Sequence, residues 1–99
     1  MQPENTKAEE GVLKIFYYAA TGAAIAAREI GRKDGIILVK HPAFTRMKDN
    51  QAGFHFDPLS FVECEFSLYK EACLGETLMP EILVPFYKKY ELERDRSSK

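Results

Sequence analysis

Cysteine is scarce in this chain, and its scarcity excludes a disulfide-stapled fold. Only Cys64 and Cys73 occur among 99 residues, and there is no CxxC motif. Two cysteines are too few for a disulfide framework. We therefore expect reduced thiols and a cytoplasmic protein, since thiols stay reduced in the cytosol.

An excess of charge of one sign is also missing. Lys and Arg number 14 against 15 Asp and Glu, which gives a formal net charge of −1. No global positive field therefore attracts phosphates from a distance. Any binding of nucleic acid must come from a local basic patch.

No apolar run is long enough to span a membrane. The longest candidate, residues 12–27, is interrupted by Lys14 and closed by Arg28 and Glu29. It falls short of the roughly 18–20 apolar residues that a spanning helix needs. Acidic residues precede it, where a signal peptide carries positive charge. We expect no membrane partner.

Residue constellations typical of catalysis or metal binding are absent as well. His41 and His55 have no carboxylate or thiol at metal-ligand spacing. Cys64 lies on the apolar side of an alternating segment, where a thiol is inert. The chain has no glycine-rich phosphate loop. We therefore expect no enzyme activity, no metal or other cofactor, and no small-molecule substrate.

The clearest positive signal lies in residues 60–76, SFVECEFSLYKEACLGE. Apolar and polar residues alternate over residues 62–69, which is typical of a half-buried strand because successive side chains leave opposite faces. Lys70 and Glu71 interrupt this alternation, which then resumes at residues 72–74. The segment therefore predicts two short strands joined at a sharp, polar bend.

The N-terminal part predicts strands, with one ambiguous piece. Residues 1–11 form a polar tail or a short helix that a capping box could start. Residues 12–20 are β-branched and aromatic and predict a strand, with a turn at 21–22. Residues 23–30, AAIAAREI, have the composition of a short helix. The glycines on either side are, however, also spaced for a strand between two turns.

The middle of the chain predicts a turn at residues 31–35 and then a strand at 36–39 that is covered on both faces. We expect His41 and Pro42 to end this strand. Residues 43–60 predict a long connection in which a short strand could form at the Phe-His-Phe sequence. Basic and aromatic side chains are mixed in this connection. Those that could extend a nucleic-acid surface are Arg46, Lys48, Phe54 and Phe56.

The C-terminal region, residues 79–99, predicts a helical extension. Because Pro85 breaks any helix that has begun at Met79, we expect the helix to restart near this proline. Phe86 and Tyr90 share one helix face. Residues 91–96 are charged, and we expect them to be solvated.

Residues 69–72, Tyr-Lys-Glu-Ala, resemble the second signature of the Sm-like family. They most closely resemble its bacterial Hfq-like members, which carry Tyr-Lys-His-Ala at this bend. In the first half of the chain, residues 21–22 look like the turn that closes the first hairpin, and residues 23–30 lie where the second strand runs. The resemblance covers roughly residues 13–40 and 61–76.

The resemblance implies a mainly β fold, a five-stranded, strongly bent small β-barrel over residues 12–78 that assembles into a ring. The fourth and fifth strands, here residues 62–69 and 72–75, leave open edges that pair between subunits. On this interpretation residues 23–30 form a strand. The implied partner is single-stranded RNA, in an RNA-chaperone role. The implied RNA-binding residues are Tyr69, Lys70 and Lys33, and the implied subunit interface consists of Val62, Cys64, Phe66, Leu68, Cys73 and Leu74.

Three residues depart from the family pattern. Gly35 stands near the position of a base-stacking aromatic residue, Ile36 replaces an asparagine of the wider family, and Glu71 replaces a pore histidine. A ring of carboxylates at the pore repels phosphates unless Lys70 pairs with them. A second hypothesis is therefore a ring-forming scaffold that has lost the RNA site. A third is an α+β monomer in which residues 22–31 are helical.

Overall fold

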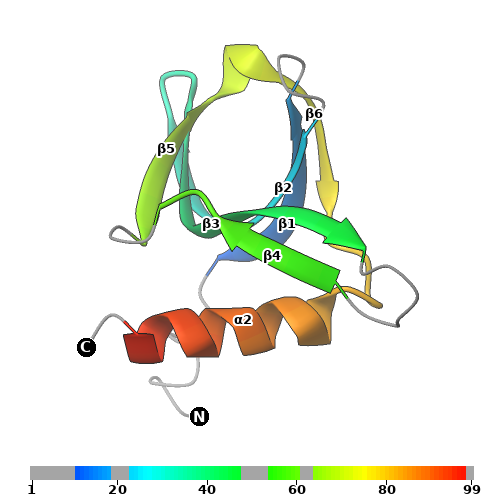
Figure 1. The fold of residues 1–99 in the computed structure, drawn as a ribbon. Helices are drawn as coiled ribbons and strands as arrows, with labels where there is room; N and C mark the ends of the chain where they lie inside the picture. The colour runs from blue at the N-terminus through cyan, green and yellow to red at the C-terminus, as the bar shows by residue number, and fades with distance from the viewer. Residues whose placement is uncertain (1–10, 19–22, 48–53, 61–63, 98–99) are drawn as a thin grey trace, which may run out of the picture.

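The computed structural model describes residues 11–18, 23–47, 54–60 and 64–97, and within them the chain is mainly β (Figure 1). The short 3-10 helix η1 (Lys70–Ala72) joins the last two strands, and the helix α2 (Val84–Ser97) follows them. The strands are β1 (Val12–Tyr18), β2 (Ala23–Lys33), β3 (Ile36–Met47), β4 (Phe54–Pro58), β5 (Glu65–Tyr69) and β6 (Cys73–Leu78). The expected tail or short helix at residues 1–10 lies outside the described residues.

All strand pairs are antiparallel, in the order β4-β3-β2-β1-β6, and β5 also pairs with β3. β3 serves both partners because residues 36–40 pair with β5 and residues 43–47 pair with β4. Among the described strands, β5 pairs with β3 alone and β6 with β1 alone. One edge of β5 and one edge of β6 therefore carry backbone groups that form no hydrogen bonds with another described strand.

The sequence predicted that β3 ends at His41 and Pro42. This prediction is wrong, because the strand continues to Met47. The register between β2 and β3 shifts at this point, so that these two residues stand opposite Ala27 alone. At such a bulge the missing N–H of Pro42 removes no ladder hydrogen bond. His41 adopts a φ of 50°, and its N–H donates to the Cys64 carbonyl 2.6 Å away. The bulge bends the strand without ending it.

Two hydrophobic clusters cover opposite faces of β2, which explains why AAIAAREI forms a strand. Ala26 belongs to the cluster next to α2, Ala27 belongs to the cluster inside the bend of the sheet, and both are fully buried. β1 and β3 flank β2 on either side. These contacts outweigh a helix preference of less than about 1 kcal/mol per residue. The helix that the third hypothesis placed at residues 22–31 is therefore wrong for the described residues 23–31, which form a strand.

α2 lies across the end of the sheet opposite η1 (Figure 1). The Pro80 carbonyl accepts hydrogen bonds from Leu83 and Val84, and the helix begins at Val84, so Pro85 lies in the first turn, where no N–H is needed. The predicted restart is confirmed. The buried residues of the cluster between α2 and the sheet are Ile15, Ala26, Ala43, Met79, Leu83, Tyr87 and Tyr90.

Glu91 is buried, which contradicts the expectation that residues 91–96 are solvated. The Arg28 guanidinium donates two hydrogen bonds to the Glu91 carboxylate, each 2.8 Å long. A second polar contact joins α2 to β3, where the Tyr87 hydroxyl donates to the His41 carbonyl over 2.8 Å. A buried charge needs a partner, so the helix supplies the counter-ion that Arg28 on β2 requires.

Candidate functional site

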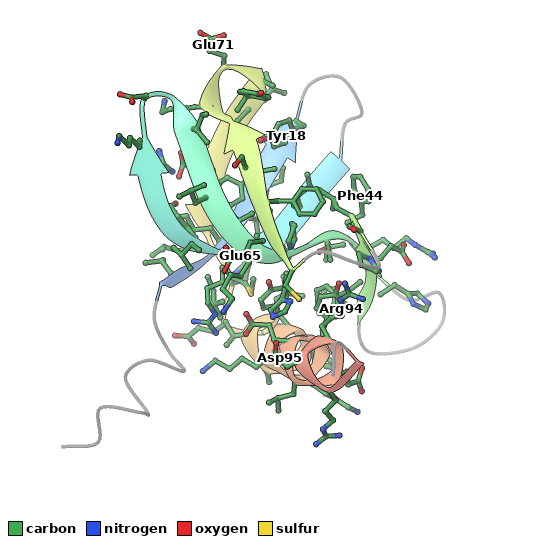
Figure 2. All side chains as sticks on the ribbon, turned by 90° about the vertical axis from the view of Figure 1, so that its left-hand side faces the viewer. Tyr18, Phe44, Glu65, Glu71, Arg94 and Asp95 are labelled. Carbon is green, nitrogen blue, oxygen red and sulfur yellow. The ribbon has the colours of Figure 1, made fainter. Side chains whose placement is uncertain are left out.

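The bend between β5 and β6 projects three polar side chains from the end of the sheet opposite α2. Tyr69, Lys70 and Glu71 are all exposed, Tyr69 by 67%. Figure 2 shows Glu71 pointing away from the sheet at this end. The alternation over β5 is as predicted, since Leu68 is buried and Tyr69 is exposed.

A backbone hydrogen bond fixes this bend to the turn between β2 and β3. The N–H of Lys70 donates to the Gly35 carbonyl over 3.0 Å. The two segments enclose a pocket of about 210 Å³. Lys33 and Lys70, both predicted from the resemblance, are thereby brought to one site, and Tyr69 directly precedes Lys70 in the chain. The residues that line the pocket are Arg32, Lys33, Asp34, Gly35, Ile36, Ile37 and Lys70.

Gly35 leaves the pocket open on the turn side. Its φ is +79°, a conformation that favours glycine, and a Cβ added there would meet nothing within 4 Å. Lys33 and Lys70 form no ion pair with any described residue, and neither does Glu71. The two ammonium groups are therefore available to an anion, while the carboxylate beside them opposes it.

Arg32 is held by a network of ion pairs over β1, β2 and β6. Its guanidinium binds the Glu29 carboxylate at 2.8 Å and also contacts Glu76. Lys14 binds Glu29 at 2.9 Å and Glu76 at 2.8 Å. Four side chains thus neutralise one another beside the pocket, and the sequence analysis did not find them because they come from three strands.

The network shifts the pKa values of its members toward the charged forms. A hydrogen bond from Arg32 lowers the pKa of Glu29, and one from Lys14 lowers the pKa of Glu76. The bond to Glu76 raises the pKa of Lys14, and the bond to Glu29 raises that of Arg32. Burial opposes each shift and is the smaller effect.

We expect acid to weaken the fold through this network. A carboxylate with a lowered pKa stabilises the folded state above its ordinary pKa of 4.5, and this contribution is lost as the pH falls through the lowered folded value. As the pH is lowered beneath about 4.5, the melting temperature should therefore decrease. Glu76→Gln should make this decrease smaller. Glu81→Gln, at an exposed position outside the network, is the control. Equal acid slopes in all three proteins would contradict a role for the network.

The predicted interface residues differ in how much surface they leave to a partner. Leu68 is 7% exposed and belongs to the chain's own core, with Phe66 and Cys73 packed against the same cluster. The side chain of Leu68 therefore has little surface left for contact with another subunit. Cys64 is half-buried, whereas Leu74 is 75% exposed. Val62 lies outside the described residues.

β6 carries a second exposed leucine that the sequence analysis missed. Leu78 is 69% exposed and lies in the part of β6 that extends beyond the predicted end at residue 75. Leu74 lies at an irregularity in the pairing with β1, between Cys73 opposite Tyr18 and Gly75 opposite Tyr17, so strand alternation does not place it on the face of Leu78. β6, whose second edge pairs with no described strand, therefore exposes two large apolar side chains.

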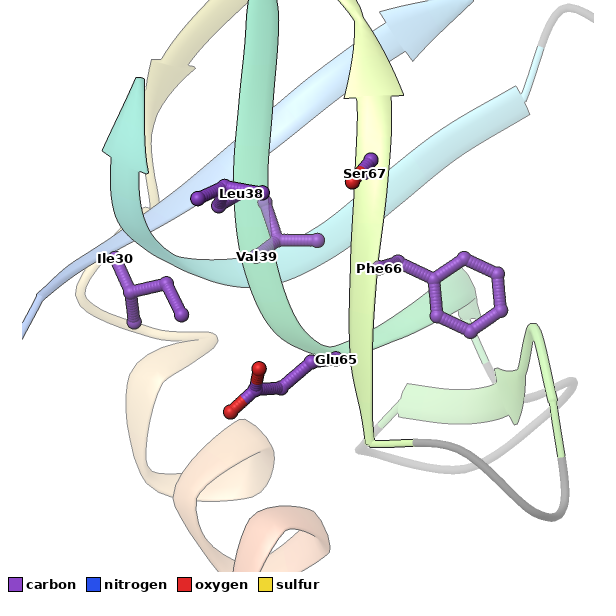
Figure 3. A pocket seen from close by; sticks show the side chains of 6 residues that line it. All are labelled: Ile30, Leu38, Val39, Glu65, Phe66 and Ser67. Atoms are coloured by element: carbon purple, nitrogen blue, oxygen red, sulfur yellow. The ribbon is translucent and has the colours of Figure 1, made fainter. Parts of the chain in front are cut away.

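An open groove of about 480 Å³ lies beside β5. Figure 3 shows Ile30, Leu38 and Glu65 on one side of the strands, with the ring of Phe66 turned to the other side. Leu38 is 41% exposed, so the prediction that residues 36–39 are covered on both faces is wrong for this position. The residues that line the groove are Ile30, Leu38, Val39, Glu65, Phe66 and Ser67.

In the described part of residues 43–60, the basic and the aromatic side chains lie in different places. The predicted short strand is confirmed as β4, and its aromatic side chains face α2. Phe54 contacts the ring of Phe86, with centroids 5.5 Å apart, and Phe56 packs against Tyr87 and Tyr90. Arg46 is exposed and lies 3.5 Å from Asp57. Lys48 lies outside the described residues.

The remaining candidate groups show no sign of metal chemistry in the part of the chain that the structure describes. No group of three or more His, Cys, Asp or Glu side chains there could hold a metal ion. His41 is buried with Nε2 3.0 Å from an Asp95 oxygen, and Cys64 and Cys73 are free. None of the helices in the described ranges is long and apolar enough to cross a membrane.

Comparison of the chain with protein-family models, with curated proteins and with solved structures finds no match.

Proposed function

We propose that this protein is an Sm-like subunit that pairs edge to edge with copies of itself in a closed ring and binds single-stranded RNA at the end of the sheet that carries η1. The observation that carries the proposal is the hydrogen bond from Lys70 to Gly35, which gathers two lysines without an ion pair among the described residues beside an exposed tyrosine. The Sm-like family membership rests on the resemblance of residues 69–72 at this same bend.

The two edge strands support the ring. β5 and β6 each lack a second partner among the described strands, and open edges favour pairing with another chain. Leu74 and Leu78 are exposed on β6, while the groove with Leu38 lies beside β5. Because these two surfaces differ, a contact between them is head-to-tail, and such contacts form a ring when the rotation closes.

The side chains at the bend support RNA binding. An exposed tyrosine can stack on an unpaired base, which is a common mode of RNA recognition. Lys70 follows Tyr69 directly, and Lys33 reaches the same pocket from the adjacent turn. Their ammonium groups suit the phosphates of a strand whose base lies on the tyrosine.

Binding of uridine-rich and adenine-rich RNA at two salt concentrations tests this function. We expect the affinity to fall as salt rises, and to fall about tenfold with Tyr69→Ala, since base stacking contributes about 1–3 kcal/mol. Lys70→Ala should also weaken binding, whereas Glu71→Gln should strengthen it by removing a like charge next to the phosphates. Lys89→Ala on α2, exposed at the opposite end of the sheet, should have no effect.

The alternative is a ring-forming scaffold without an RNA site. Glu71, exposed and without an ion pair to Lys70, is the observation that favours it, together with the net charge of −1. The scaffold would be supported, and RNA binding contradicted, by a ring that binds neither uridine-rich nor adenine-rich RNA at low salt. Glu71→Gln should then also leave RNA binding undetectable.

A further inference from the structure

We propose that the pocket between the β2–β3 turn and η1 holds a phosphate group of the RNA strand, and that the site therefore accepts strands of any base sequence. This inference rests on the proposed function, because it specifies which part of the RNA the site recognises.

The size of the pocket favours a group smaller than a whole nucleoside. Its volume is about 210 Å³, below the roughly 300–1,000 Å³ typical of pockets that enclose a small-molecule ligand. Gly35 adds no side chain to fill or shape it. A phosphate and its sugar can approach the turn closely there, as at other glycines that face a ligand.

The charges that line the pocket fit an anion. Arg32 is already bound to Glu29 and Glu76, so its charge is largely compensated. Lys33 and Lys70 have no ion-pair partner among the described residues, and Asp34 is the single acidic residue of the lining. The lining therefore contains two lysines without an ion pair among the described residues against one aspartate, and phosphate is a group that lysine binds well.

The lining lacks most of the groups that distinguish one base from another. Selection among bases requires stacking surfaces together with donors and acceptors that match base edges. Among the lining residues there is no aromatic ring, no side-chain amide and no hydroxyl. Tyr69 lies outside the lining and is mostly exposed, and stacking on a single ring tolerates any base because every base has a π-face.

The test compares uridine, adenine and cytidine homopolymers of one length on the unmodified protein. We expect their dissociation constants to agree within about threefold at each salt concentration. Lys33→Ala and Lys70→Ala should each weaken all three by the same factor and make the affinity less dependent on salt, because a lost phosphate contact releases fewer counterions. Lys89→Ala should leave both the affinity and the salt dependence unchanged.

Three results overturn the inference, and they differ in what else they overturn. A preference of tenfold or more for one homopolymer, or a lysine substitution that weakens only one of them, contradicts the phosphate pocket but leaves RNA binding standing. Absence of salt-dependent binding to any homopolymer contradicts the proposed function and this inference together. Unchanged salt dependence in both Lys→Ala variants, with weaker binding, would mean that the lysines act on the fold and not on phosphate.

Discussion

Replacing Glu91 with alanine is expected to lower the free energy of unfolding by about 3 kcal/mol, because it leaves the Arg28 charge buried without its two hydrogen bonds. For a domain of this size the melting temperature should fall by about 12 °C or more. Urea unfolding at one fixed protein concentration measures the change.

Glu93→Ala is the matched control for this substitution. It removes an exposed carboxylate from the same helix, and we expect a change within about 0.5 kcal/mol. If Glu91→Ala behaved like Glu93→Ala, the ion pair between α2 and β2 would not contribute to the fold as described.

If copies of the chain form the proposed ring, replacing both Leu74 and Leu78 with aspartate is expected to convert it to monomers. Both side chains are largely exposed within one subunit, so the change leaves that subunit's core intact. It places two charges where the proposed neighbour covers apolar surface, and burying an unpaired charge is strongly unfavourable. Light scattering should give a mass near the 11.3 kDa of a single chain, with the circular dichroism of the unmodified protein.

Leu92→Asp provides the comparison for the double variant. Leu92 is also an exposed leucine, but it lies on α2 and not on the edge of β6. We expect it to keep the mass of the unmodified protein. A double variant that assembled as well as Leu92→Asp would exclude the β6 edge as the contact between subunits.

Local patterns in the sequence predicted the part of the fold that is determined locally. Alternation predicted β5, and its interruption at Lys70 and Glu71 predicted the bend that η1 forms. The same approach left β2 ambiguous, because alanine content favours a helix and only the family resemblance indicated a strand. There the outcome depends on β1, β3 and two hydrophobic clusters, which are contacts that a window of eight residues does not contain.

The candidate site shows the same division between local and distant contacts. The Tyr-Lys pair could be singled out from its position at the bend, but the bond from Lys70 to Gly35 joins segments that lie far apart in the sequence. Glu91 stands in a charged run and was therefore predicted to be solvated. Arg28 carried the available signal, since a charge next to the buried Ala26 and Ala27 requires a partner.

The mass of the unmodified protein in solution tests the central claim, that the free edges of β5 and β6 pair with one another between copies of the chain. We predict a single species several times heavier than the 11.3-kDa chain, with a mass that stays constant on dilution. A protein that remains a monomer at every concentration would contradict the account.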